Sequence, residues 1–164
     1  MKFIKNKYVI KLLVVLVIFA LDRITKIYIL DLFENNSLEE LAINEFLNIY
    51  LIWNEGIAFG LLNFENQTIY NSITLIIIFI SIIILIIAIR IKNYVGYFFA
   101  IIFGGSLGNL YDRIYFSAVP DFIDIHIGNY HWFIFNVADI FISIGVICLI
   151  LDELFNNKKL NEKI

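Results

Sequence analysis

The sequence predicts an all-α membrane protein with four transmembrane helices, folded as a single domain over residues 1–164. Hydrophobic residues make up 61% of the chain, whereas soluble domains contain roughly 45–50%. Crossing a hydrocarbon layer of about 30 Å takes about 20 helical residues, and four apolar segments reach or approach that length. We place these segments at residues 10–30, 69–89, 94–111 and 133–152.

The first apolar segment follows a positively charged N-terminus, an arrangement that also occurs in cleaved secretory signal peptides. The charges are Lys2, Lys5, Lys7 and Lys11. The apolar run continues through Asp22, lacks a small-x-small cleavage site and is followed by three further apolar segments. We therefore expect an uncleaved first span.

Lysine and arginine are distributed unevenly among the connecting segments, which predicts the orientation of the chain. The N-terminal tail has four, the turn between the second and third spans has two, and the C-terminal tail has three. Between Lys26 and Arg90 there is none, although seven acidic residues lie there. We expect both termini in the cytoplasm and the segments 31–68 and 112–132 at the outer face, where all the unusual polar residues gather.

Both outer segments contain short predicted elements. Residues 46–53 are rich in aromatic and β-branched residues and read as a strand. Asn54, Glu55 and Gly56 form a turn signal, and residues 57–62 then favour a short surface helix. A second strand is predicted at about 122–127.

Polar residues also lie inside otherwise apolar helices, where a charge costs several kcal/mol unless it is paired or functional. Asp22 and Lys26 are four residues apart in the first span and share a helix face. They form an internal ion pair, support a site, or do both. In the third span, Gly104 and Gly108 have the small-xxx-small spacing that lets helices approach closely.

Asn109, Asp112 and Arg113 follow on one face of the third helix. Two interpretations stand side by side. Asp112 and Arg113 pair and cap the helix end, or the carboxylate acts directly in catalysis. Structural pairing is the commoner explanation for carboxylates of this kind.

Two further aspartates, Asp121 and Asp139, flank the start of the last span. Asn136, Asp139 and Ser143 fall on one face of that helix at spacings of three and four residues. The rest of the helix is apolar, so a lone carboxylate there would be costly. We expect Asp139 to face the protein interior and a partner.

Asp124 and His126 alternate with isoleucines, so in a strand they lie on the face opposite Asp121, which we interpret as the solvent-facing side. A metal site that combines these residues with His131 and Asp139 is conceivable, but no HExxH or comparable spacing supports it. Serine or cysteine catalysis lacks a recognisable nucleophile elbow.

Two converging aspartates in a partly dry site suit acid–base chemistry without a metal. Two close carboxylates cannot both ionise easily, so one pKa rises and the pair holds one proton. The charged member activates water while the neutral member protonates a carbonyl.

Five motifs occur in order along nearly the whole chain, and with them the sequence resembles the lipoprotein signal peptidases, also called signal peptidase II. The motifs are Asp22-x-x-Thr25-Lys26, Asn54-x-Gly56-x-x-Phe59, Gly104-Gly105-x-x-Gly108-Asn109-x-x-Asp112-Arg113, Val119-x-Asp121-Phe122 and Phe135-Asn136-x-Ala138-Asp139.

The resemblance implies an aspartic endopeptidase of the bacterial inner or plasma membrane that cuts diacylglyceryl-modified prolipoproteins before the lipidated cysteine. It implies that Asp121 and Asp139 are the catalytic pair. It also implies a small extracytoplasmic β-cradle and a surface helix over the substrate cleft, within residues 46–62. The implied supporting residues are Asp22, Lys26, Asn54, Gly56, Gly108, Asn109, Asp112, Arg113, Asn136 and Ala138. We expect no metal, cofactor or nucleic acid, membrane lipids as neighbours, and activity as a monomer.

The chain departs from the resembled pattern at Trp53, Ile57, Ser106 and Pro120. Pro120 fixes φ and lacks an N–H, so it alters how the strand presents Asp121. A small ion or drug transporter is the alternative of another class, but transporter carboxylates usually lie near the midplane, often within repeats. A structural membrane subunit would leave Asp139 unexplained.

Overall fold

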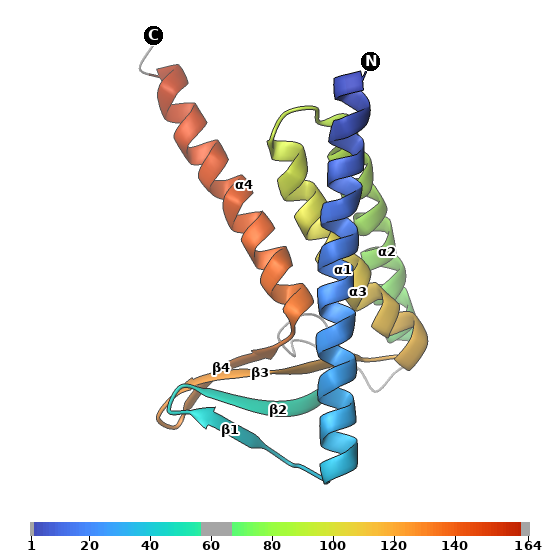
Figure 1. The fold of residues 1–164 in the computed structure, drawn as a ribbon, viewed down its shortest axis with the longest axis vertical. Coiled ribbons are helices and arrows are strands. Elements are labelled where there is room, and N and C mark those ends of the chain that lie inside the picture. Colours follow the sequence, from blue (N-terminus) through green and yellow to red (C-terminus); the bar gives the residue numbers. More distant parts are fainter. Residues whose placement is uncertain (1, 57–66, 162–164) are drawn as a thin grey trace.

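The computed structural model describes residues 2–56 and 67–161, which form four helices and a four-stranded sheet (Figure 1). In chain order the elements are α1 (Lys2–Asn36), β1 (Leu41–Asn44), β2 (Leu47–Asn54), α2 (Gln67–Arg90), α3 (Val95–Phe116), β3 (Val119–Ile127), β4 (Tyr130–Phe135) and α4 (Val137–Asn161). The expected surface helix at 57–62 lies outside the described residues.

The sheet is antiparallel with the order β1-β2-β3-β4 and lies across one end of the helices (Figure 1). The predicted strand at 46–53 is confirmed as β2, and the one at 122–127 extends back to Val119 as β3. The expected start of the last span at residue 133 is wrong. The aromatic run 130–135 pairs with β3 from Ile127 to Ile123, so α4 begins only at Val137.

α1 is longer than the predicted first span, and the outer segment expected from residue 31 begins as helix. Its 35 residues span roughly 52 Å at 1.5 Å per residue, well beyond a hydrocarbon layer of about 30 Å. The last turns continue past the sheet (Figure 1), where Ile29 and Phe33 pack with Phe122 of β3. This apolar contact fixes the sheet against α1.

α3 packs against all three other helices, and its glycines make this possible. A Cβ at Gly104 would lie 3.0 Å from Ile18 Cβ, and one at Gly108 would lie 2.5 Å from an oxygen of Asp22. The small-xxx-small contact predicted for these two glycines is therefore confirmed, with α1 as the partner. On another face, Ser106 shares a 2.5 Å hydrogen bond with Ser81 of α2. This bond accounts for the serine at position 106, where the chain departs from the resembled pattern.

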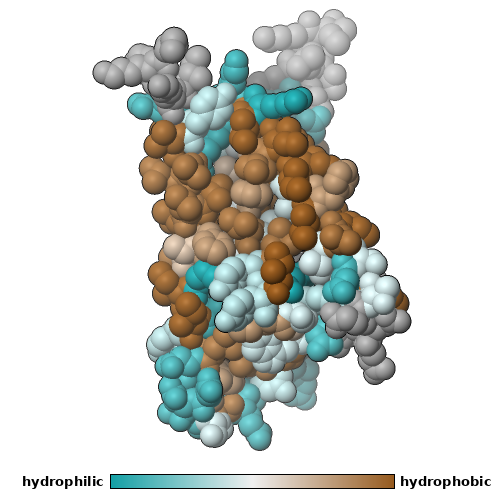
Figure 2. All heavy atoms as spheres, turned by 90° about the vertical axis from the view of Figure 1, so that its right-hand side faces the viewer, coloured by the Kyte–Doolittle hydropathy of each residue, from teal (hydrophilic) through white to brown (hydrophobic). Residues whose placement is uncertain are grey.

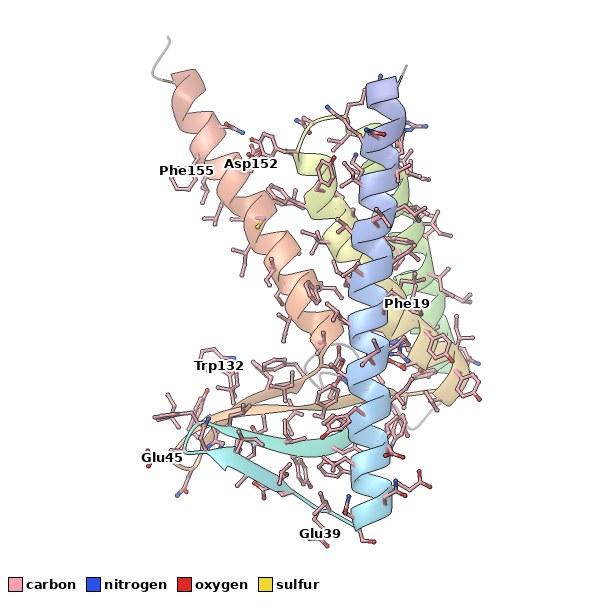
Figure 3. The ribbon with its side chains drawn as sticks, in the orientation of Figure 1. Phe19, Glu39, Glu45, Trp132, Asp152 and Phe155 are labelled. Atoms are coloured by element: carbon pink, nitrogen blue, oxygen red, sulfur yellow. The ribbon has the colours of Figure 1, made fainter. Side chains whose placement is uncertain are left out.

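Apolar surface dominates the helices. Figure 2 shows a broad hydrophobic band over them, with hydrophilic residues gathered at both ends. Figure 3 places Asp152 toward the end that carries both termini, and Glu39 and Glu45 at the sheet end. Among the described residues, one helix, Thr68–Arg90, is long and apolar enough by itself to cross a membrane.

Candidate active site

Asp121 lies in β3 and is 3% exposed. Its two carboxylate oxygens accept hydrogen bonds from Asn54 Nδ2 at 2.8 Å and Asn136 Nδ2 at 2.6 Å. Burial, reinforced by the nearby charge of Asp139, raises the pKa of Asp121 to about 6, although both amide bonds oppose this rise. The side chain therefore holds its proton far more readily than an ordinary aspartate.

Asp139 lies in the first turn of α4, where Asn136 caps the helix. Asn136 Oδ1 accepts from the Asp139 amide at 3.1 Å, and Asp139 Oδ2 accepts from the Asn136 amide at 3.2 Å. This reciprocal pair resembles a capping box. Asn109 Nδ2 of α3 donates to the other oxygen of Asp139 at 2.8 Å.

Asn136 thus contacts both aspartates and is itself fully buried. Its side chain amide holds Asp121 from β3, and its backbone amide holds Asp139 from α4. Because one residue orients both carboxyl groups, the end of β4 and the start of α4 bring together two residues that are 18 positions apart.

Behind the aspartates lies a buried network of four charges from α1 and α3. Lys26 Nζ contacts Asp22 at 3.0 Å and Asp112 at 2.6 Å, and it donates to Asn109 Oδ1 at 2.9 Å. Arg23 contacts Asp22 at 2.7 Å and Asp112 at 2.5 Å. Lys26 therefore sets the amide of Asn109 so that its nitrogen points to Asp139.

Arg23 is the supporting residue that the sequence analysis missed, because only Asp22 and Lys26 were considered in the first span. The predicted Asp112–Arg113 pairing is wrong: Asp112 pairs with Arg23 and Lys26. The signal in the sequence was Arg23 itself, a second cation that directly follows Asp22 in an otherwise apolar run, although its distant partner Asp112 could not be inferred from spacing.

Arg113 instead connects the site to β2. Its guanidinium donates to the carbonyl of Gly56 at 3.1 Å and to that of Asn109 at 3.4 Å. Asn54 Oδ1 accepts from the Gly56 amide at 2.9 Å, which closes the turn after β2. The turn signal at these positions thus orients Asn54 toward Asp121.

Two small residues permit this close assembly. Ala138 is fully buried, and its amide donates to Asp22 Oδ1 at 3.1 Å, which ties the first turn of α4 to α1. Gly108 lies against the same carboxylate, and any side chain there would collide with it. Of the predicted site residues, Gly56 and Arg113 reach the aspartates only through Asn54 and Asn109, and the others contact an aspartate or one of the four charges directly.

The interpretation of Asp124 as solvent-facing is wrong. It is 4% exposed, and Oδ2 lies 2.8 Å from His131 Nδ1 across the β3–β4 pair. Asp124 shares its face of β3 with Phe122, which packs against Ile29 and Phe33 of α1, so the face opposite Asp121 is not the solvent-facing one. Within the described ranges, no group of three or more His, Cys, Asp or Glu side chains is arranged to hold a metal ion.

A groove of about 240 Å³ runs along α4 beside Asp139. Apart from Asp139 and Ser143, its lining is apolar: Phe135, Ile140, Ile144 and Ile147. The pair of acids is therefore bordered on one side by a hydrocarbon-lined surface.

Pro120 occupies a tolerant position in β3. It pairs with Trp53 of β2, while β4 pairs with β3 only from Ile123 onward. Its missing N–H therefore removes no bond to β4, as expected where proline occurs in a sheet.

The chain matches the family model of signal peptidase (SPase) II over residues 14–155. A lipoprotein signal peptidase of Pelagibacter ubique is 56% identical over 161 residues, which cover 98% of this chain and 96% of the relative. One from Anaplasma phagocytophilum is 38% identical, with coverage of 95% and 99%.

Two solved bacterial membrane enzymes, determined by the in meso method, have the same fold. The first superposes with a TM-score of 0.72 at 30% identity, and the match covers 91% of this chain and 90% of the solved chain. The second has a TM-score of 0.69 at 31% identity, with coverage of 88% and 92%. The chain therefore belongs to the signal peptidase II family, and it is an enzyme of the aspartic peptidase class.

Proposed function

We propose that this chain removes signal peptides from diacylglyceryl-modified prolipoproteins, cleaving before the lipidated cysteine, with Asp121 and Asp139 as the catalytic pair. The observation that carries the proposal is the placement of Asn136, which hydrogen bonds to both carboxyl groups at once. The family match and the names of the relatives support the substrate class.

The chemistry needs one proton shared between the two acids. The charged member takes a proton from water as the water oxygen attacks the scissile carbonyl carbon, and the neutral member gives its proton to the carbonyl oxygen. The tetrahedral intermediate then collapses, the C–N bond breaks, and the released amine of the cysteine takes a proton from the pair. A pKa of about 6 for Asp121 supports a retained proton near neutral pH.

The supporting residues hold this pair without taking part in bond making. Asn54, Asn109 and Asn136 donate to the aspartates, and the network of Asp22, Lys26 and Asp112 fixes Asn109 and the start of α4. Arg113 fixes the Gly56 turn. Since all of these residues belong to one chain, we propose that the monomer is active.

The apolar groove along α4 supports entry of the substrate from the membrane, because it leads along hydrocarbon-facing side chains to Asp139. We propose four spans with both termini in the cytoplasm. The asymmetry of lysine and arginine and the hydrophobic band of Figure 2 support that topology. The sheet and the pair of acids then lie at the outer face, where the lipid chains of a substrate remain in the bilayer.

The test supplies the purified chain in detergent with a diacylglyceryl-modified prolipoprotein. We expect cleavage without added metal and in the presence of a chelator. Asp121→Asn and Asp139→Asn should each lower the rate by at least about 10³-fold while the protein stays folded, since acid–base groups contribute about 10²–10⁴-fold.

Asp124→Asn is the matched control from the same strand, and we expect it to keep most of the activity. A control variant as inactive as the other two would show that the pair is misassigned. Proton-coupled transport by reconstituted protein, without cleavage, would instead favour a transporter.

A further inference from the structure

A second cavity lies at the end of the helices far from the aspartates, between α1, α2 and α3. Its volume is about 270 Å³. Its lining is almost wholly apolar: Leu12, Val15, Leu85, Ala88, Ile89, Ala100 and Phe103, with Tyr8 and Lys11. The mechanism makes no use of this space.

Lys11 is buried at this cavity, at 6% exposure. Its ammonium donates to the carbonyls of Ala88 at 2.7 Å and Ile91 at 2.5 Å, and it lies 5.5 Å from the ring centre of Tyr97. The two carbonyls accept two of its three N–H groups, and none of these partners carries a negative charge. One turn earlier, Lys7 donates to the carbonyl of Lys92 at 3.3 Å.

Positive charge therefore accumulates here without ion pairs. Within residues 2–56 and 67–161, neither Lys7, Lys11, Arg90 nor Lys92 has a carboxylate within ion-pair distance. The contrast with the other end is direct, because Arg23 and Lys26 each contact two carboxylates there. Figure 2 shows hydrophilic side chains gathered at the end of the helices nearest the termini.

We propose that this cavity binds one anionic diacyl glycerophospholipid from the leaflet that the N-terminus faces. An acyl chain fills the apolar space between α1 and α2, and the phosphate lies among the ammonium groups at its mouth. Basic pockets between transmembrane helices are suited to anionic headgroups. A zwitterionic lipid carries its own cation, which the surrounding lysines and Arg90 repel.

The occupant follows from the combination of the two features. A free phosphate would use the charge and leave the apolar cavity unfilled, and an uncharged lipid would fill the cavity and leave the charge unpaired. Only a ligand with an apolar chain and an anionic group fills the cavity and pairs the charge, so we assign the site to the anionic lipid. It does not depend on the peptidase mechanism, and its test uses no activity assay.

The test measures lipid retention by the full-length chain in detergent, by native mass spectrometry and by thermal unfolding. Dioleoyl phosphatidylglycerol, dioleoyl phosphatidylcholine and inorganic phosphate are added separately. We expect one phosphatidylglycerol per chain, at least tenfold tighter than phosphatidylcholine, and a rise of the unfolding temperature that phosphate does not reproduce.

Two double variants separate the site from bulk charge. Lys7→Gln with Lys92→Gln should weaken phosphatidylglycerol binding at least tenfold. Lys158→Gln with Lys159→Gln removes the same amount of charge from the C-terminal segment. This variant should bind phosphatidylglycerol within twofold of the parent. Leu12→Trp narrows the cavity without altering charge and should also weaken binding.

Equal retention of the two lipids would overturn the proposal, as would equal effects of the two double variants. Full stabilisation by phosphate alone would overturn the lipid as the ligand. Unchanged binding by Leu12→Trp would rule out the cavity as the acyl site.

Discussion

Arg23 of α1 holds both carboxylate oxygens of Asp112 on α3, with N···O distances of 2.5 and 2.7 Å. Asp112 is fully buried, and one nitrogen of the same guanidinium also contacts Asp22. The planar guanidinium is suited to such bidentate contacts, whereas a lysine ammonium is not. The cation–π contact of Arg23 with Tyr111, in which Cζ lies 4.7 Å from the ring centre, further orients it.

We expect Arg23→Gln to lower the free energy of unfolding by about 3 kcal/mol, because removing one partner leaves buried charge uncompensated. Arg23→Lys should recover part of this loss, since it restores the charge but not both bonds. Thermal unfolding in detergent measures both changes. An Arg23→Gln protein as stable as the parent would show that Lys26 alone suffices for Asp22 and Asp112.

Asn136 offers a way to separate helix capping from orientation of the aspartates. Asn136→Asp keeps an oxygen that can accept from the Asp139 amide, but it replaces the donor to Asp121 with a third carboxylate. Asn136→Ala loses both interactions. For Asn136→Asp we expect near-parental helix stability and a fall of at least about tenfold in kcat. For Asn136→Ala we expect kcat to fall as well, together with a loss of stability of about 1 kcal/mol from the missing cap.

Unfolding temperature and kcat for the two variants test this directly. If Asn136→Asp cleaves substrate at the parental rate, the donor to Asp121 is not needed. In that case the residue serves only as a cap.

The pKa of Asp121 predicts how stability depends on pH. The group binds its proton more tightly in the folded chain, where the pKa is about 6, than in the unfolded chain, where it is near 3.8. Its contribution is therefore greatest below pH 3.8 and is lost as the pH rises through about 6, by up to about 3 kcal/mol. Unfolding measured between pH 4 and 7 should show this loss in the parent.

Asp121→Asn should flatten that slope, because the amide does not titrate. Asp124→Asn removes one carboxyl group from the same strand and serves as the control, with the parental slope retained. The same slope in all three proteins would assign the pH dependence to other groups.

Much of the architecture was readable from the sequence because hydrophobic runs and residue spacing report helices directly. The close helix contact at Gly104 and Gly108 followed from their spacing, whereas its partner α1 is known only from the structure. β4 was not readable, since its last three residues, Phe133 to Phe135, are as apolar as the helix that follows, and only the cap at Asn136 separates the two. Pairing with β3 decides the boundary, and that is a tertiary effect.

The site likewise contains some features that the sequence predicts and others that it does not. The spacing of Asn136 and Asp139 identified a shared face, and the structure shows why it matters, since the two residues cap each other. The Arg23 contact was beyond simple spacing, because its partner lies 89 positions away. The burial of Asp124 was missed because alternation separates the two faces of β3 but does not show which face is covered, and the face of Asp124 also carries Phe122, which packs against α1.

Adjacent glycines of α3 give the sharpest test of how closely the aspartate of α4 must be placed. A Cβ on Gly105 would lie 2.5 Å from the carbonyl oxygen of Ala138, the residue before Asp139. This neighbour is backbone in the first turn of α4, so it cannot rotate away. A Cβ on Gly104 would lie 3.0 Å from Ile18 Cβ and 3.3 Å from Val15 Cα, so it would press on α1, which must give by a few tenths of an ångström, and not on α4.

Both substitutions to alanine carry the same gain in helix propensity, about 1 kcal/mol. We expect Gly105→Ala to push α4 away from α3 and to lower kcat at least about tenfold, since a misplacement near 1 Å costs up to about 10²-fold. Gly104→Ala should stay within about threefold of the parent. Cleavage rates and unfolding temperatures of the two variants, measured side by side, check the expectation. Equal kcat values in two folded proteins would mean that the start of α4 tolerates displacement.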